Sequence, residues 1–172
     1  MQIGTAKYGI RDEQGNSWPQ HAKELSKVVK AFEIKLSQGA KPGKGGLLPA
    51  SKVHEEIAAI RGIPVNQDSI SPNRHKDINN IDELLDKINH LRELTGRPVG
   101  IKTAIGGWNF INELCDSINR RGLQYAPDFL TIDGGEGGSG AAPHSLMDHV
   151  SLPISEALPR VIDALIQSDL KN

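Results

Sequence analysis

The chain has 172 residues, a length typical of one domain, and a formal net charge of −1 from 20 Lys+Arg and 21 Asp+Glu. This balance gives no bulk attraction to nucleic acid or to an anionic membrane surface, and no apolar run is long enough to span a bilayer. The single cysteine, Cys115, excludes an internal disulfide and an all-cysteine metal site, and it favours a reducing cytoplasm.

Apolar segments of strand and helix type alternate along the chain, which predicts a parallel α/β architecture. The clearest element is a helix over Ile81–Thr95, where Asn80 offers a capping oxygen and Gly96 ends the apolar stripe. In chain order we expect a strand within Gln2–Ile10, a helix over His21–Val29, a strand at Ala31–Leu36, a helix over Lys52–Arg61, the helix Ile81–Thr95, a strand at Pro98–Ala104, a helix over Asn109–Arg120, a strand at Pro127–Asp133 and a helix over Ser155–Leu170. Ser37–Pro49, Gly62–Asn80 and Gly134–Gly140 are expected to be loops.

Charged residues fall where three of the predicted strands end. Lys35 and Lys102 lie near the ends of two strands, and Asp133 ends a third, directly before a glycine-rich loop. Ligands of parallel α/β proteins bind at the carboxyl ends of the strands. The clustering therefore predicts a site for an anionic or oxygen-rich ligand, although a lysine at a strand end can also simply extend into solvent.

Two glycine-rich loops could bind phosphate. Gly135, Gly137 and Gly140 have the dinucleotide-binding spacing, but the helix that should open there is absent from the pattern. Free backbone N–H groups around one phosphate, or a plain flexible turn, are the remaining interpretations. The Gly39–Gly45 segment resembles a nucleoside-triphosphate loop, yet Gly45 replaces the magnesium-binding Ser or Thr, which argues against a kinase or ATPase. The histidines have no metal-binding spacing, so no metal site is predicted.

Long segments of the chain resemble the FMN-binding synthase domain of the glutamate synthase family. They are EIKLSQGAKPGKGG (33–46), ISP (70–72), PVGIK (98–102), TIDGGEGGSGAAP (131–143) and the opening QIGTAKYGIR (2–11), in the family's order. The resemblance covers essentially the whole chain, so residues 1–172 are expected to be one partial synthase domain.

The resemblance implies a (β/α)8 barrel of TIM type, of which this chain would be an incomplete, central part, because a full barrel takes about 250 residues. It implies FMN at the carboxyl face of the barrel. There 2-oxoglutarate and ammonia would form 2-iminoglutarate, which reduced FMN converts to L-glutamate. An iron–sulfur cluster would deliver the electrons, and the identity of the electron donor stays open. The cysteines that would bind such a cluster are absent from this chain. Another chain could supply the rest of the barrel or a glutaminase subunit.

The same resemblance assigns roles to residues of this sequence. Gln38 and Lys41 are the expected catalytic residues, and together with Arg61 they are the expected contacts of 2-oxoglutarate. Cations suit a dicarboxylate, and an arginine can hold a carboxylate with two hydrogen bonds. A cation near the flavin ring also stabilises its reduced, anionic form. The expected FMN-binding residues are Lys35, Lys102, Asp133, Gly134, Gly135 and Gly137.

Two alternatives stay open. Lys44 stands where many family members carry a glutamate of the substrate site, so methylamine could replace ammonia and the product could be N-methylglutamate. The chain could also be a truncated, non-catalytic protein or a split-barrel subunit that needs a partner chain.

Overall fold

The computed structural model describes residues 1–11, 19–136, 140 and 142–171. Its elements are β1 (Gln2–Ile3), α1 (Pro19–Leu25), β2 (Phe32–Lys35), β3 (Leu47–Leu48), the 3-10 turn η1 (Ala50–Lys52), α2 (Glu55–Arg61), β4 (Ser69–Ile70), α3 (Ile81–Thr95), β5 (Val99–Ala104), α4 (Asn109–Arg121), the 3-10 turn η2 (Leu123–Tyr125), β6 (Leu130–Asp133) and α5 (Ile154–Gln167).

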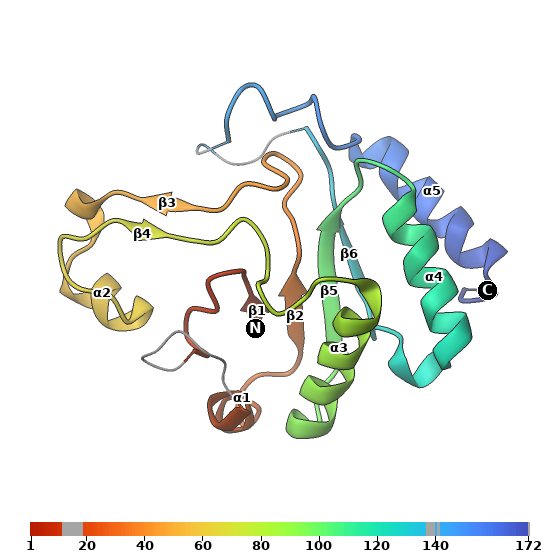
Figure 1. Ribbon diagram of the computed structural model, residues 1–172, viewed down its shortest axis with the longest axis horizontal. Helices are drawn as coiled ribbons and strands as arrows, with labels where there is room; N and C mark the ends of the chain where they lie inside the picture. Colours follow the sequence, from red (N-terminus) through yellow and green to blue (C-terminus); the bar gives the residue numbers. More distant parts are fainter. Residues whose placement is uncertain (12–18, 137–139, 141, 172) are drawn as a thin grey trace.

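The main sheet of the described residues has four parallel strands in the order β1-β2-β5-β6, with α3, α4 and α5 beside it (Figure 1). Spatial order equals chain order, and every connection between neighbouring strands carries a helix. A doubly wound sheet would reverse its order at a switch point, whereas a barrel sheet does not. The fold is therefore α/β with a parallel sheet, and its topology is compatible with part of a TIM-type barrel.

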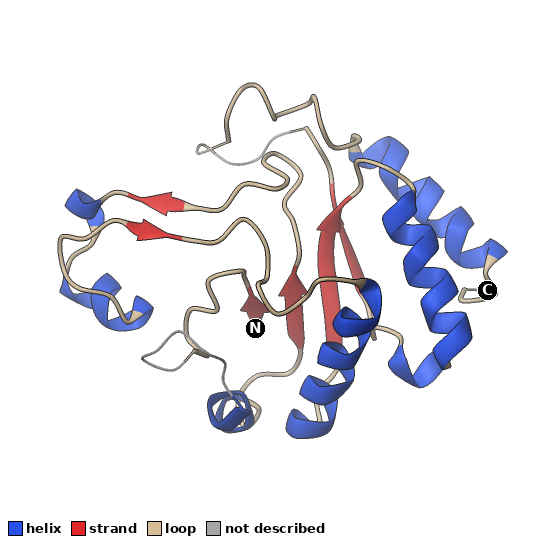
Figure 2. Cartoon of the chain, viewed as in Figure 1, coloured by secondary structure: helices blue, strands red, loops and turns tan. Residues whose placement is uncertain are grey.

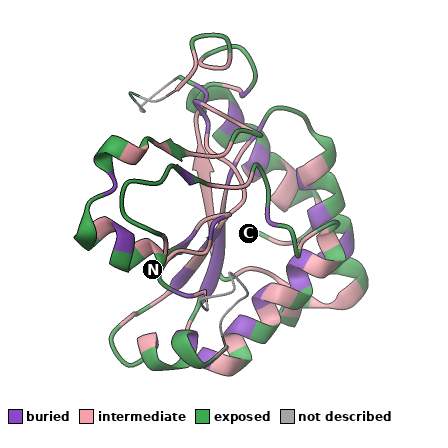
Figure 3. Cartoon of the chain, turned by 60° about the vertical axis from the view of Figure 1, so that its left-hand side comes forward, coloured by how far each residue is buried: buried purple, intermediate pink, exposed green. Residues whose placement is uncertain are grey.

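The sheet has an apolar face and a polar face, because successive residues of a strand point to opposite sides. Phe32, Ile34, Val99 and Ile101 are fully buried in one cluster with residues of α3 and α4. Figure 3 shows this burial on the strands and on the adjoining helices. The alternate positions of neighbouring strands carry the polar residues Gln2, Glu33, Lys35, Lys102, Thr131 and Asp133. All the charged residues expected at strand ends thus share one face.

Helix α3 begins and ends where the sequence predicts, because each end carries a local signal. The side chain of Asn80 accepts a hydrogen bond from the backbone N–H of Glu83 at 2.9 Å, and Gly96 adopts the left-handed conformation with φ of 63°. Its apolar stripe is buried at Leu84, Leu85, Ile88 and Leu91. Single-residue capping is short-range, which is why this helix can be located from sequence.

Two elements near the N-terminus are shorter than expected. The first strand ends at Ile3 rather than Ile10, because two successive turns follow it. Lys7 N donates to Gly4 O at 3.0 Å and Ile10 N donates to Lys7 O at 3.1 Å, with Lys7 itself at a positive φ of 54°. Helix α1 runs over Pro19–Leu25 instead of His21–Val29.

The two expected loops on either side of Lys52–Arg61 each contribute a short strand. Strands β3 and β4 pair in antiparallel register, with Leu47 opposite Ile70, and together with η1 and α2 they form an arm, residues 47–70, that projects from the sheet (Figure 2). The helix expected over Lys52–Arg61 is divided. Val53 is buried but precedes α2, and Ile60 within α2 is 62% exposed.

Candidate functional site

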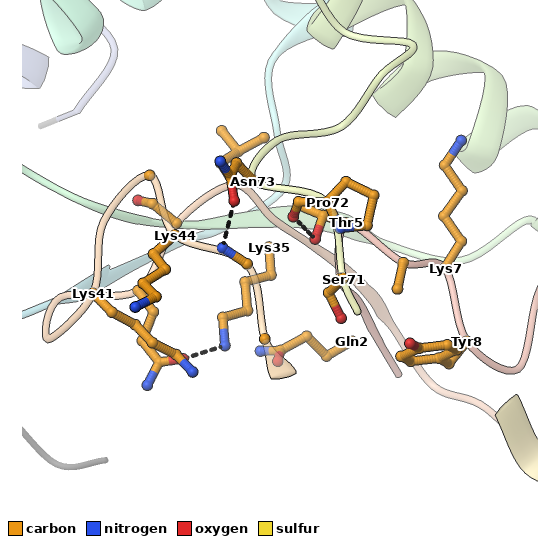
Figure 4. A pocket seen from close by; sticks show the side chains of 18 residues that line it. Gln2, Thr5, Lys7, Tyr8, Lys35, Lys41, Lys44, Ser71, Pro72 and Asn73 are labelled. Carbon is orange, nitrogen blue, oxygen red and sulfur yellow. Dashed lines mark hydrogen bonds between the residues drawn. The ribbon is translucent and has the colours of Figure 1, made fainter. Parts of the chain in front are cut away.

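A pocket of about 280 Å³ opens where β1 and β2 end. Its wall comes from the turn after β1, the loop after β2 and the segment after β4. Among the described residues its lining includes four lysines, Lys7, Lys35, Lys41 and Lys44, and no aspartate or glutamate. Figure 4 shows Lys35, Lys41 and Lys44 gathered at one end and Tyr8 at the other, with Ser71 between them. This charge distribution fits an anionic ligand.

Lys35 and Gln38 are in direct contact at the lysine-rich end. Lys35 Nζ donates to Gln38 Oε1 at 2.8 Å, and Lys41 lines the same wall. Burial lowers the pKa of Lys35, repulsion from Lys102 lowers it further, and Asp133 counters part of this decrease. A bound anion would relieve both the burial cost and the repulsion, so Lys35 favours such a ligand.

Lys102 and Asp133 lie next to this group on the polar face. Lys102 Nζ is 3.3 Å from Asp133 Oδ1, and Asp133 Oδ2 accepts the backbone N–H of Gly39 at 2.8 Å. The carboxylate therefore ties β6 to the loop after β2. The structure brings together five of the predicted site residues, Lys35, Gln38, Lys41, Lys102 and Asp133.

The glycines of the two loops permit close contacts with neighbouring backbone. A Cβ atom on Gly39 would lie 1.7 Å from the carbonyl oxygen of Gly134, and one on Gly135 would lie 2.3 Å from that of Ser151. Gly134 and Gly135 thus have a packing role, and their predicted contact with a flavin phosphate stays a prediction. The third predicted glycine, Gly137, lies outside the described residues.

Arg61 lies apart from the lysine-rich end of the pocket, beside Tyr8. It is not among the residues that line the pocket. Its Nη1 donates to Ser69 Oγ at 2.9 Å, and its guanidinium carbon is 4.8 Å from the centroid of the Tyr8 ring. The sequence interpretation assigned no role to Tyr8 and Ser71, which line the pocket, or to Ser69, which bonds to Arg61. Tyr8 and Ser71 lie in segments that resemble the family, but only the folded chain brings the turn after β1 and the segment after β4 to the same pocket.

A buried histidine, His75, is hydrogen-bonded to the backbone at the end of β2, where the loop of the site begins. His75 is 2% exposed, and because a carbonyl oxygen can only accept, its Nε2 donates to the Lys35 carbonyl at 2.9 Å. Its Nδ1 has no hydrogen-bond partner among the described residues. Burial lowers the pKa of His75, and the nearby charges of Lys87 and Lys7, which both pair with Asp77, act in the same direction.

The lowered pKa of His75 predicts a loss of stability in mild acid. Below the unfolded-state value of 6.5 the unfolded chain binds a proton that the folded chain does not. The free energy of unfolding should then fall by up to about 1.4 kcal/mol per pH unit, until the pH reaches the folded-state pKa. Urea unfolding between pH 7.5 and 5 measures this slope for the chain and for His75→Gln, whose amide can still donate to Lys35.

His75→Gln should flatten the slope, while His149→Gln at an exposed position should leave it unchanged. An identical pH dependence in the chain and in His75→Gln would contradict the assignment of a neutral, buried His75.

Fold and site together define an α/β protein with a lysine-rich pocket at the carboxyl edge of a parallel sheet. The conserved region of glutamate synthase matches residues 1–172, so the chain belongs to the glutamate synthase family. Within the described residues, no group of three or more His, Cys, Asp or Glu could hold a metal ion, and no helix is long and apolar enough to cross a membrane.

Curated relatives match nearly the whole chain. The glutamate synthase large subunit-like protein YerD of Bacillus subtilis is 43% identical over 96% of this chain and 31% of its own length. The archaeal-type glutamate synthase [NADPH] of Dehalococcoides mccartyi is 36% identical over 100% of this chain and 31% of its own length. The ferredoxin-dependent glutamate synthase of Cyanidium caldarium is 31% identical over 99% of this chain and 10% of its own length. The chain thus spans about a third or less of the length of each relative. Two of the three are named as glutamate synthases, which are oxidoreductases.

Proposed function

We propose that this chain contributes the 2-oxoglutarate site, and part of the FMN site, of an enzyme that reductively aminates 2-oxoglutarate to L-glutamate. The observation that carries the proposal is the lysine-rich pocket without a lining carboxylate, placed where the predicted substrate residues Gln38 and Lys41 meet Lys35. A dicarboxylate would replace the repulsion among these lysines by attraction.

Gln38 and Lys41 have distinct roles in this proposal. Lys41 binds the carboxylate next to the 2-oxo group, and its positive charge also favours electron density on the oxo oxygen as nitrogen adds to the carbon. Gln38, whose Oε1 accepts from Lys35, has its amide N–H groups left to orient the same end of the substrate. Ammonia is the proposed nitrogen source, and methylamine would use the same groups.

The polar face of the sheet fits FMN. Lys102 and Lys35 provide cations on that face, Asp133 fixes Lys102, and the close contact between Gly39 and Gly134 shows a wall built of backbone rather than side chains. When bound, FMN would supply the hydride for the reduction. Residues Lys35, Lys102 and Asp133 would hold the ring, and Gly134, Gly135 and Gly137 would lie towards the phosphate.

The proposed enzyme needs more strands than the four of this sheet. We propose that the parallel sheet closes into a (β/α)8 barrel with segments of the longer protein, whose remainder also carries the iron–sulfur cysteines. The electron donor is left open, since the relatives' names specify NADPH in one case and ferredoxin in another. The predicted cytoplasmic location rests on the single cysteine.

Titration of FMN into the full chain, followed by flavin fluorescence, tests the cofactor part. We expect saturable quenching, and Lys102→Met should weaken FMN binding about tenfold because it removes one cation from the ring site. Lys52→Met, an exposed lysine of η1, is the matched control and should bind FMN like the unaltered chain. Equal binding by all three proteins would count against a flavin site at Lys102.

A further inference from the structure

Tyr8 lies at the end of the pocket opposite Lys35, Lys41 and Lys44, close to two guanidinium groups. The guanidinium carbons of Arg61 and Arg11 are 4.8 Å and 4.9 Å from the centroid of its ring. Its hydroxyl is 2.6 Å from the Oγ of the buried Ser69, which also accepts from Arg61 Nη1 at 2.9 Å. The Tyr8 ring therefore contacts the Arg61 guanidinium directly. Ser69, which is bonded to the Tyr8 hydroxyl, holds one edge of the same guanidinium.

The backbone of Arg61 is held from the same side. Arg11 Nη2 donates to the carbonyl oxygen of Arg61, and also to that of Gly62 at 3.5 Å, where α2 ends. Thr5 Oγ1 donates to the Pro72 carbonyl at 2.7 Å, just beyond the arm. The turn after β1 thus clamps the arm at the pocket, and Tyr8 is the residue of this turn that touches both the pocket and Arg61.

This arrangement leaves most of the guanidinium available. Among the described residues, the side chain of Arg61 makes one hydrogen bond, to Ser69, out of the five N–H groups that an arginine carries. A free arginine side chain loses rotamer entropy when it binds a carboxylate, and an arginine already fixed by its surroundings loses less. Fixing Arg61 before the ligand arrives therefore strengthens its hold on a carboxylate.

We propose that Tyr8 is a positioning residue for Arg61, holding the guanidinium so that it receives the second carboxylate of a dicarboxylate whose first carboxylate lies among Lys35, Lys41 and Lys44. The inference rests on the proposed function and goes beyond it in naming the residue that makes the site selective for two carboxylates. Burial alone would raise the pKa of Tyr8, but hydrogen bonds with Ser69 and Ser71 and the two arginine charges lower it overall, as expected for a hydroxyl polarised within this cluster.

Selectivity distinguishes this role from a merely structural one. A ligand with a single carboxylate uses the lysine-rich end alone, so loss of Tyr8 should leave its binding unchanged. A ligand with a second carboxylate loses the benefit of a fixed Arg61. The ratio of the affinities for 2-oxoglutarate and for 2-oxopentanoate, which has the same carbon chain without the second carboxylate, reports the difference directly.

Calorimetric titration of both ligands into the full chain and its variants provides the test. Tyr8→Leu should weaken 2-oxoglutarate about tenfold and 2-oxopentanoate less than twofold, and Tyr8→Phe, which keeps the ring, should retain most of the selectivity. Tyr8→Leu should add nothing further in the background of Arg61→Ala, since both changes remove the same contact. Equal weakening of the two ligands in Tyr8→Leu would overturn the proposal and leave Tyr8 a structural residue.

The nitrogen–proton signal of Arg61 Nε, observed by NMR without any ligand, provides a second readout. We expect a signal shifted by the Tyr8 ring that is lost in Arg61→Ala and averaged towards free arginine in Tyr8→Leu. An unchanged signal in Tyr8→Leu would overturn the positioning role. Failure of the unaltered chain to bind 2-oxoglutarate, with the Arg61 signal shifted as expected, would instead overturn the proposed function while supporting the positioning of Arg61 by Tyr8.

Discussion

Replacing Lys41 by alanine should weaken 2-oxoglutarate binding about a hundredfold, which corresponds to about 2.7 kcal/mol. The side chain lines the lysine-rich end of the pocket beside Lys35 and Gln38, where no carboxylate of the described lining competes with an anionic ligand. A hydrogen bond between charged partners is worth about 1.5–3 kcal/mol, and here it also offsets the repulsion among the lysines. Calorimetric titration of the variant and of the unaltered chain measures the change.

Lys52→Ala is the matched control for charge. Lys52 is exposed in η1 and does not line the pocket, so its loss changes the net charge equally without removing a contact. If both variants lost affinity to the same extent, the effect would come from long-range electrostatics and the role assigned to Lys41 would be wrong. Repeating the titrations at two salt concentrations separates the two contributions, because distant charges are screened more strongly.

Replacing Gly39 by alanine should lower the free energy of unfolding by about 3 kcal/mol, the upper part of the range for overpacking a tight site. The new Cβ would lie 1.7 Å from the carbonyl oxygen of Gly134 and 2.4 Å from its carbonyl carbon. Both are backbone atoms, so the two loops must separate. Separation would also stretch the hydrogen bond from Gly39 N to Asp133 Oδ2, which is 2.8 Å long. Urea unfolding of the chain and the variant measures the loss.

Gly107→Ala provides the control for this prediction. A Cβ atom on Gly107 would have no atom within 4 Å, and its φ is not in the left-handed region. Its free energy of unfolding should therefore stay within about 0.5 kcal/mol of the unaltered chain, as for most surface substitutions. Equal stability of Gly39→Ala and Gly107→Ala would show that the two glycine loops do not meet as described.

Sequence reasoning located the elements whose signals are local. The cap at Asn80 and the stop at Gly96 lie within a turn of α3, and the strands β2, β5 and β6 each end within one position of the expected end. The contact between Lys35 and Gln38 is also local, since they are three residues apart. Such features depend on neighbours along the chain and can be predicted without a tertiary structure.

Features that depend on distant pairing could not be predicted in the same way. Strand β3 exists only because Leu47 pairs with Ile70, and a two-residue strand carries no periodicity of its own. The hydrogen bond between Gly39 N and Asp133 Oδ2 joins residues that are 94 positions apart in the sequence. The packing role of the glycines therefore could not be predicted from the sequence. The contacts of Arg61 with Tyr8 and Ser69 could not be predicted either, because they follow from how the arm folds back on the turn after β1. Its predicted contact with the substrate stays a prediction.

Mapping backbone amide shifts by NMR during a 2-oxoglutarate titration shows whether 2-oxoglutarate binds in the lysine-rich pocket. We expect the largest shifts in the three segments that line the pocket, at residues 4–8, 35–46 and 71–73. A second groove, of about 520 Å³ between β6 and α5, is lined mostly by apolar residues and should show none. Saturable shifts centred on that groove, or no shifts at residues 35–46 in the folded chain, would show that 2-oxoglutarate does not bind in the lysine-rich pocket.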